Sequence, residues 1–375
     1  MALIDRDCFL QIAQIERRNK IMRLTQLTKL VLNLAVGFGM SWMSPCAAYS
    51  QAVKIGRNLA EITKLANQEG RVRMASGLEP DVEPLVLQGF RQKFPQIKVE
   101  HAELTPPDRE RILNEALAGM VESDVVDVST NLHSNYIKAN ILAGPFEFKK
   151  LFPDVPENHL SPNGYFVGVG FTANVLAYNT TLVAPRRIPK DWQDCLDPQW
   201  RGKLIVPARP KPFVGLSFGW GEARVLEYVS QLKQNQPAWK TSQAESFTQL
   251  AAGEYQMICG AYYFTYNALL RKDPGVKIAV SFPSEVPVLL SETLAIMKGT
   301  KNPNASLLLA SWLASAEGQK GYDHIGRGSP FVKGGDMAKI LQKNGSKVIY
   351  GGWDLPDYEP VITAKIISAW GFRNE

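Results

Sequence analysis

Three tyrosines lie within five residues of the stretch ICGAYYFTYNALLRK, at Tyr262, Tyr263 and Tyr266. A short apolar run precedes them and a helical pattern follows, so they are predicted at a strand-to-helix boundary. Buried phenols need hydrogen-bond partners, and exposed phenols would form an adhesive surface patch. A third interpretation is that they contact a ligand, because adjacent side chains at a helix start can both face a cleft.

Polar residues also gather in four loops that follow predicted strands, at 76–81, 129–134, 208–215 and 260–265. In open α/β sheets, ligands bind beyond the carboxyl ends of strands, where loops lead into helix N-termini. Solvated loop charges and helix caps are the alternative interpretation of these residues. The candidate ligand-binding residues are Ser76, Glu79, Ser129, Thr130, Asn131, Arg209 and Tyr266.

The elements that position these loops alternate between strands and helices. Strand-like runs at 72–76, 97–104 and 124–130 are separated by segments with helical spacing. This alternation predicts mostly parallel sheets with helical crossovers. Residues 165–179 are predicted to form two consecutive strands, and residues 303–326 one long helical segment.

The composition is that of a globular protein with a full core. The chain has 375 residues, 45% of them hydrophobic and 21% charged, a length that suits about two domains. Six basic and three acidic residues in the first 52 account for +3 of the net charge of +6. The remainder is therefore near neutral, and no nucleic-acid partner is expected.

Residues 1–52 are predicted to be a signal segment for export, with Met22 as a candidate start. Basic residues are followed by an apolar run and then by small residues. A retained membrane anchor is the alternative, but the apolar run is shorter than the ~20 residues that a span needs. The mature protein is therefore expected in the periplasm. For the two cysteines beyond this segment, Cys195 and Cys259, a disulfide and two buried free thiols both remain open, with free thiols slightly favoured.

Several stretches, in the same order along the chain, resemble extracellular solute-binding proteins of bacterial ABC importers. The most specific are WQDCLDPQWRGK and NPNASLLLASWLASAEGQ, and the resemblance covers about residues 71–358. The branch that the chain most resembles contains ferric-iron-binding proteins. The resemblance implies a monomer that binds a small solute in a cleft, closes by rigid-body motion and delivers the solute to an ABC permease in the inner membrane.

The fold implied by this resemblance is an α/β, two-lobe periplasmic-binding-protein clamshell of type 2. Each lobe is expected to be a mostly parallel sheet flanked by helices. Two hinge strands, near residues 166–175 and 286–296, would join the lobes. Lobe one would comprise 71–166 plus 290–375, and lobe two 167–289.

In the ferric-iron branch, a Tyr-Tyr pair at the position of Tyr262 and Tyr263 supplies phenolate oxygens to the metal. Fe³⁺ favours anionic oxygen and would lower the phenol pKa far below its usual value of about 10. Members of this branch often carry a histidine or tyrosine in the first loop, where this chain offers only Glu79 and Asp81. Some carry a further tyrosine after the strand that follows RGK, where this chain has Phe213 and Phe218. The expected ligand is therefore Fe³⁺ held with the help of a synergistic anion, and no resident cofactor is required.

Two alternatives to iron binding remain open, one within the class of solute-binding proteins and one outside it. The solute could be organic: a polyamine or thiamine-like cation near the aromatic cluster, or a phosphonate near Arg209. A periplasmic enzyme or sensor partner on the same scaffold is the other class. The sequence contains neither H-E-x-x-H nor a Walker A motif, and an enzyme is not expected.

Overall fold

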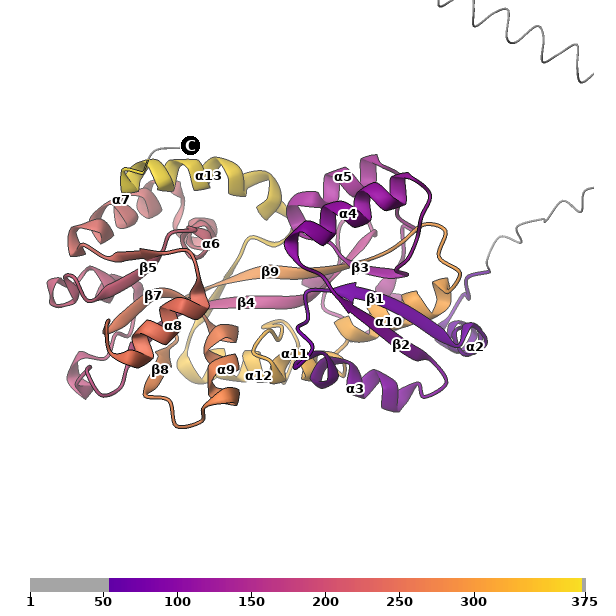
Figure 1. The fold of residues 1–375 in the computed structure, drawn as a ribbon, viewed down its shortest axis with the longest axis horizontal. Helices are drawn as coiled ribbons and strands as arrows, with labels where there is room; N and C mark the ends of the chain where they lie inside the picture. The colour runs from indigo at the N-terminus through magenta and orange to yellow at the C-terminus, as the bar shows by residue number, and fades with distance from the viewer. Residues whose placement is uncertain (1–53, 373–375) are drawn as a thin grey trace, which may run out of the picture. The chain divides into compact units, whose positions relative to one another are not determined.

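The computed structural model describes residues 54–372, and Figure 1 shows their fold. The predicted export segment, residues 1–52 with Met22, lies outside the described residues. None of the described helices is long and apolar enough to cross a membrane.

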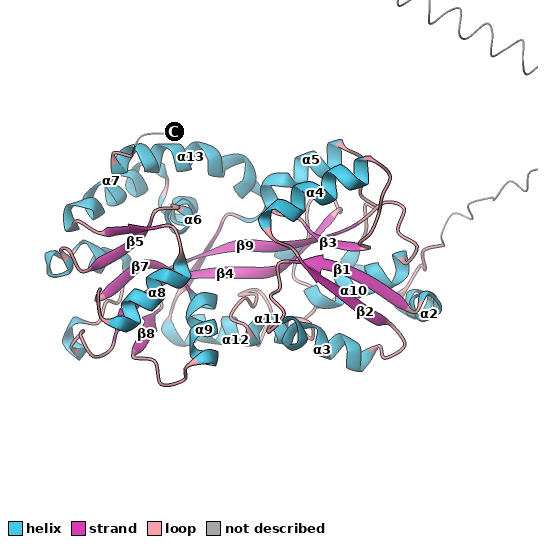
Figure 2. Cartoon of the chain, in the orientation of Figure 1, coloured by secondary structure: helices cyan, strands magenta, loops and turns pink. Residues whose placement is uncertain are grey.

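A mixed sheet of ten strands forms the centre of the described chain (Figure 2). Its order is β2-β1-β3-β9-β4-β7-β5-β6, with β10 paired to β9 and β8 paired to β4. Strands β1, β2 and β3 pair in parallel, as do β5, β6 and β7, so each half of the sheet contains a parallel set. The strands are β1 (Arg71–Ser76), β2 (Lys98–Glu103), β3 (Val125–Asp127), β4 (Phe166–Asn179), β5 (Leu204–Pro207), β6 (Ala238–Lys240), β7 (Met257–Tyr262), β8 (Ile278–Ser281), β9 (Glu285–Ile296) and β10 (Lys347–Tyr350).

The two long strands β4 and β9 join the halves of the sheet and pair antiparallel (Figure 1). All 14 residues of β4 are buried, which explains its nearly continuous apolar sequence. The prediction of two consecutive strands over 165–179 is wrong, because one strand continues through register shifts between Gly168 and Phe171 and after Val175. A β-bulge bends a strand without ending it.

Helices lie on both sides of the sheet (Figure 2). The single helix predicted over 303–326 is instead two helices, α10 and α11. The chain turns sharply at Gly318, where an added Cβ would lie 2.1 Å from the Trp312 carbonyl oxygen. The α-helices are α2 (Leu59–Glu69), α3 (Glu83–Lys93), α4 (Pro106–Leu117), α5 (His133–Lys138), α6 (Lys211–Trp220), α7 (Glu222–Leu232), α8 (Gln243–Ala252), α9 (Tyr263–Lys272), α10 (Pro303–Ala314), α11 (Gln319–His324), α12 (Asp336–Asn344) and α13 (Leu355–Trp370).

Two large hydrophobic clusters underlie the two halves of the sheet. The first includes Phe90 of α3 and Trp312 of α10, and the second includes Trp192 and Phe213. The C-terminal helix α13 contributes Trp370 to the second cluster. The exact lobe boundaries stay a prediction, and we propose that α13 be grouped with the second cluster because its apolar face packs there.

Cys195 and Cys259 form a disulfide bond, with their Cα atoms 6.1 Å apart. Cys195 lies on the 3-10 turn Trp192–Leu196 and Cys259 on β7, and both are fully buried in the second cluster. The preference for free thiols is therefore wrong. Packing of the turn against β7 brings the two residues within the distance that a disulfide spans, and sequence separation alone does not reveal this.

Replacing both cysteines with alanine should lower the free energy of unfolding by about 4 kcal/mol. The bond joins two cysteines that are 64 residues apart in the sequence, and it therefore restricts the unfolded chain. Urea unfolding of the C195A/C259A variant, followed by circular dichroism, measures this change. Wild-type protein unfolded with a thiol reductant should show a similar loss. Equal unfolding midpoints with and without reductant would contradict a stabilising bond.

Candidate ligand-binding site

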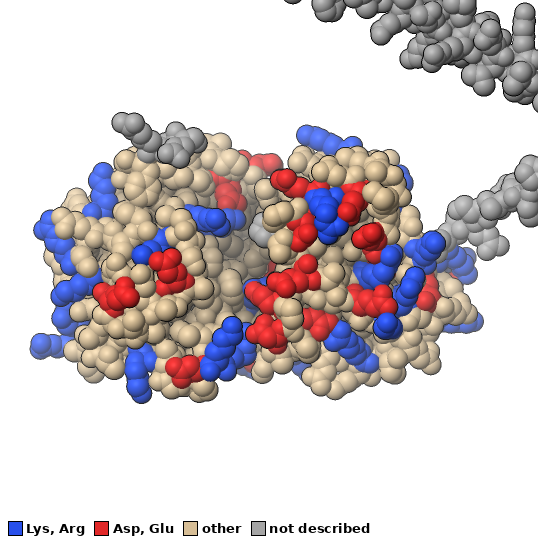
Figure 3. Space-filling view, in the orientation of Figure 1, with Lys and Arg blue, Asp and Glu red and all other residues tan. Residues whose placement is uncertain are grey.

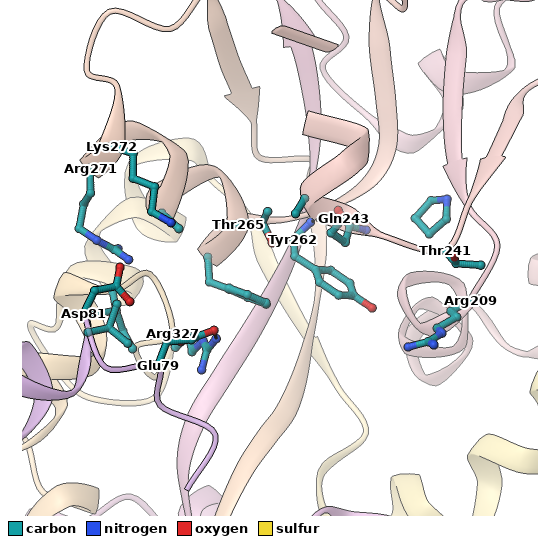
Figure 4. A pocket seen from close by; sticks show the side chains of 16 residues that line it. Glu79, Asp81, Arg209, Thr241, Gln243, Tyr262, Thr265, Arg271, Lys272 and Arg327 are labelled. Carbon is teal, nitrogen blue, oxygen red and sulfur yellow. Dashed lines mark hydrogen bonds and ion pairs between the residues drawn. The ribbon is translucent and has the colours of Figure 1, made fainter. Parts of the chain in front are cut away.

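Two adjoining cavities share Tyr262 and Phe264 in their walls, and together they form the cleft of this protein. The first, about 430 Å³, is called the basic cavity (Figure 4). The second, about 270 Å³, is called the polar cavity. The charged residues of the basic cavity are Glu79, Asp81, Arg209, Arg271, Lys272 and Arg327. The polar cavity is lined by Ser129, Thr130, Asn131, Thr172, Lys211, Ser291 and Glu359, with apolar side chains between them.

The two sides of the cleft carry side chains of opposite charge. Figure 3 shows a hollow between the two halves, with acidic side chains along one rim and a basic group on the other. Glu79 and Asp81 follow β1, whereas Arg271 and Lys272 end α9. Figure 4 shows Arg271 extending toward Asp81. These side chains would therefore attract each other if the cleft narrowed.

Tyr262 is the last residue of β7 and the N-cap of α9. Its backbone pairs with Asn174 of β4, and its N–H donates to Gln243 Oε1 at 3.3 Å. Two residues earlier, Gly260 has φ +91°, and a Cβ there would lie 3.1 Å from Pro212. Glycine is therefore favoured at this position, where β7 passes the start of α6.

Burial, helped by the nearby Glu359 carboxylate and opposed by Arg209, raises the pKa of the Tyr262 phenol to about 12. The Tyr262 phenol is therefore protonated at neutral pH. A bound cation would have to displace this proton before the oxygen could act as an anionic ligand.

Tyr263 and Tyr266 do not line the basic or the polar cavity. Tyr263 lines a separate cavity with Asn267 and Asp323, and its ring centroid lies 5.2 Å from that of Phe282. Tyr266 packs against Phe247, with ring centroids 6.4 Å apart. Because α9 begins at Tyr263, successive side chains turn by roughly 100° around the helix axis. The structure thus separates the two adjacent phenols, against the expectation that both face the cleft, and Tyr263 as a metal ligand stays a prediction.

Ser76 hydrogen-bonds to the backbone of the first loop and does not line either cavity of the cleft. It is fully buried, its hydroxyl lies 2.9 Å from His101 Nε2, and it accepts a hydrogen bond from the Leu78 N–H at 3.4 Å. Glu79 lies in the basic cavity as expected, with half of its side chain exposed. Ligand contact by Ser76 therefore has no geometric support, whereas Glu79 remains a candidate.

Ser129, Thr130 and Asn131 line the polar cavity from the half that contains β3. Their 3-10 turn brings three uncharged polar side chains to the carboxyl end of that strand. His133, which follows, stacks on Phe166 and lies 2.8 Å from Thr293 Oγ1. Burial lowers the His133 pKa to about 4, so this ring is neutral and serves packing.

Arg209 lies in the basic cavity and is exposed. Within residues 54–372 its guanidinium has no hydrogen-bond or ion-pair partner, so its donors face the cavity unpaired. Lys211 lies in the polar cavity, with its Nζ 3.2 Å from the Glu359 carboxylate. The loop after β5 thus places Arg209 in the basic cavity, and the first residue of α6, Lys211, lies in the polar cavity.

Arg327 is a cleft residue that the strand-end rule does not identify, because it follows helix α11 rather than a strand. Its guanidinium donates to Glu292 at 2.6 Å and to Glu79 at 3.4 Å, and lies 4.5 Å from the centroid of the Phe264 ring. Glu292 is buried on β9, opposite Gly170 of β4, where an added Cβ would lie 2.8 Å from the Glu292 side chain. Arg327 therefore links β9, the first loop and α9.

Among the described residues, no group of three histidine, cysteine, aspartate or glutamate side chains could hold a metal ion. A metal in this cleft would need the Tyr262 phenolate, separate carboxylates and oxygens supplied by another molecule. The stretch GLSFG at 215–219 matches a nucleophile-elbow pattern. However, Ser217 lies within α6 and donates to the Val214 carbonyl at 2.6 Å, so it is not placed at a strand-to-helix turn.

The fold and the cleft define a two-lobe protein of the periplasmic-binding class, with two half-sheets joined by two hinge strands. The family model described as bacterial extracellular solute-binding protein matches residues 86–344. The chain therefore belongs to the bacterial extracellular solute-binding proteins. The predicted family and α/β clamshell fold are confirmed.

Solved structures of similar fold include iron-bound HitA from Pseudomonas aeruginosa, with a TM-score of 0.60, 18% identity, and coverage of 80% of this chain and 98% of that one. A Trichodesmium protein (IdiA, FutA) in complex with iron and citrate has a TM-score of 0.64 and 20% identity, with 81% and 100% coverage. Iron uptake protein A2 of Synechocystis sp. is 25% identical over 222 residues, which are 54% of this chain and 62% of that protein. Alignments with the first curated relatives span 49%, 42% and 62% of their lengths.

Replacing Arg327 with methionine should lower the free energy of unfolding by roughly 3–5 kcal/mol, because Glu292 would remain buried without its partner. The double variant R327M/E292M should recover most of that loss, since both charges are then removed. Urea unfolding of R327M, of E292M and of the double variant gives the coupling energy between the two side chains. Additive losses would contradict the pairing.

Proposed function

We propose that this protein is the periplasmic receptor of an ABC importer and that its cargo is Fe³⁺ bound together with an anion. A monomer would capture the cargo in the cleft, close on it and deliver it to a permease in the inner membrane. The observation that carries the proposal is the Tyr262 phenol at the junction of the basic and the polar cavity.

Iron is favoured by the names of similar proteins and by the chemistry of Tyr262. Similar proteins include an iron uptake protein and an iron-bound protein, and one similar structure contains iron and citrate. Fe³⁺ is a hard cation that prefers anionic oxygen, which a phenolate supplies once its proton is lost. A single phenol does not complete the coordination of this ion, so further oxygens would come from carboxylates and from the anion.

An accompanying anion is favoured by the charge and size of the cleft. The basic cavity has four cationic side chains, Arg209, Arg271, Lys272 and Arg327, against Glu79 and Asp81. Cavities of about 430 and 270 Å³ are much larger than a bare ion needs. A carboxylate-bearing chelator would fill this space and could form bidentate hydrogen bonds with the unpaired Arg209.

A second candidate cargo is an anionic organic solute without metal, such as a phosphonate. Two features favour an organic anion: Tyr263 does not face the same cavity as Tyr262, and the basic cavity has an excess of positive charge. The same four cationic side chains disfavour a polyamine or a thiamine-like cation, because like charges repel in a partly desolvated site. No catalytic step is proposed for either cargo, and no resident cofactor is required.

Fe³⁺ added with citrate to the metal-free protein should produce a visible tyrosinate charge-transfer band, and the Y262F variant should lose it and bind at least about tenfold more weakly. Because the Tyr262 pKa is about 12, the phenol is protonated at pH 7 and binding should release its proton. Calorimetry in buffers of different ionisation enthalpy measures this release.

The Y266F variant is the matched control, since that ring packs away from the cleft and its loss should leave the band unchanged. The Y263F variant tests the remaining prediction that both adjacent phenols bind the metal. A wild-type protein that stays colourless and binds citrate equally well without iron would contradict an iron cargo and favour the organic anion.

A further inference from the structure

We propose that the two parts of the cargo bind in different cavities. The metal binds to Glu359 and Tyr262 in the polar cavity, and the anion binds in the basic cavity. This inference rests on the proposed function and assigns a ligand on the C-terminal helix. Four observations support it: where α13 lies, how Glu359 is paired, which oxygens surround it, and how charge is distributed.

Helix α13 reaches the cleft from the end of the chain. Its later residues pack in the second hydrophobic cluster, where Ile366 and Trp370 are buried. Its first turns carry Leu355 and Glu359 into the wall of the polar cavity. Figure 1 shows α13 extending from beside α7 toward the half that contains α4 and α5. The helix therefore places a carboxylate in the cleft from a rigid, well-packed base.

Glu359 is paired weakly enough to be available to a ligand. Its side chain is 20% exposed, and its partner Lys211 is 53% exposed, with 3.2 Å between Lys211 Nζ and Glu359 Oε1. An ion pair with an exposed lysine contributes little free energy, because solvent screens the charges and the flexible lysine loses entropy on pairing. A multivalent cation would therefore displace the Lys211 ammonium from this carboxylate.

The surroundings of Glu359 contain the donors that a hard cation prefers. The Tyr262 phenol lies in the same wall, and Glu359 is close enough to affect its pKa. Ser129 and Thr130 supply hydroxyl oxygens from the other half of the protein. A phenolate, a carboxylate and hydroxyls form an all-oxygen set suited to a hard, highly charged ion. Glu359 would thus supply the second anionic oxygen that Tyr262 lacks.

Charge separates the two cavities on either side of Tyr262. The charged pair of the polar cavity, Lys211 and Glu359, sums to zero, so displacing Lys211 exposes a negative site. The basic cavity has four positive and two negative side chains. An anion that bridges from the metal to Arg209 would then meet positive charge on one side, and the metal would meet negative charge on the other.

The test titrates the full chain with Fe³⁺ plus citrate, and separately with citrate alone. The E359Q variant should bind Fe³⁺ with citrate about 10–100-fold more weakly, as expected when a metal site loses an interaction. It should also shift the wavelength of the tyrosinate band, since the ligand set changes, and bind citrate alone like wild type. A merely structural role for Glu359 would not move the band.

Two further variants sharpen the result. K211Q should bind Fe³⁺ with citrate more tightly than wild type, because the competing ammonium is gone. E222Q is the matched control, since Glu222 pairs with Lys365 of α13 at 2.6 Å and lines neither cavity of the cleft. It should leave binding and the band unchanged.

The possible failures are distinguishable. If wild type forms a band with Fe³⁺ and E359Q matches it in affinity and wavelength, this inference is wrong and the proposed function stands. Weaker Fe³⁺ binding by K211Q would also overturn it, because Lys211 would then contact the cargo. If wild type binds no Fe³⁺, the proposed function fails and this inference fails with it.

Discussion

The antiparallel pairing of β4 with β9 holds the two halves of the sheet together and positions both sides of the cleft. These two strands belong to both half-sheets, and each places a neighbour at the cleft: β4 pairs with β7, which ends in Tyr262, and β9 pairs with β3, which leads to Ser129. A slip of one residue would turn every side chain of β4 to the opposite face and disrupt its packing on both buried faces. Movement between the halves is therefore expected as bending at the bulges of β4, and the two groups of cleft residues stay in register with each other.

The charges of the cleft are arranged around this pair of strands. Glu292 lies on β9 itself, and its partner Arg327 reaches from there to Glu79 and to the face of Phe264. The pair fixes one positive side chain at the inner end of the basic cavity. Arg209 on the loop after β5 lies in the basic cavity, and Lys211 at the start of α6 lies in the polar cavity. Tyr262 lies between these groups, so a small change in local charge alters how readily its phenol loses a proton.

The sequence predicts the parts of the site that obey a local rule. Glu79, Ser129 and Arg209 follow strands of the sheet, and such loops must converge at its carboxyl edge. Arg327 and Glu359 follow or belong to helices, so only tertiary packing brings them to the cleft. The faces of Tyr263 and Tyr266 were not predictable either, because a shift of one residue in the start of α9 redirects both rings. The apolar spacing of Ile362, Ile366 and Trp370 is the signal that could have revealed α13.

Native mass spectrometry of the protein isolated from the cells that produce it is the decisive experiment, because it shows which of the available solutes the cleft binds. We expect a bound mass that corresponds to one iron plus a small anion, and we expect it to be lost when Tyr262 is replaced by phenylalanine. A bound organic solute with no iron, present equally in wild type and in that variant, would contradict it.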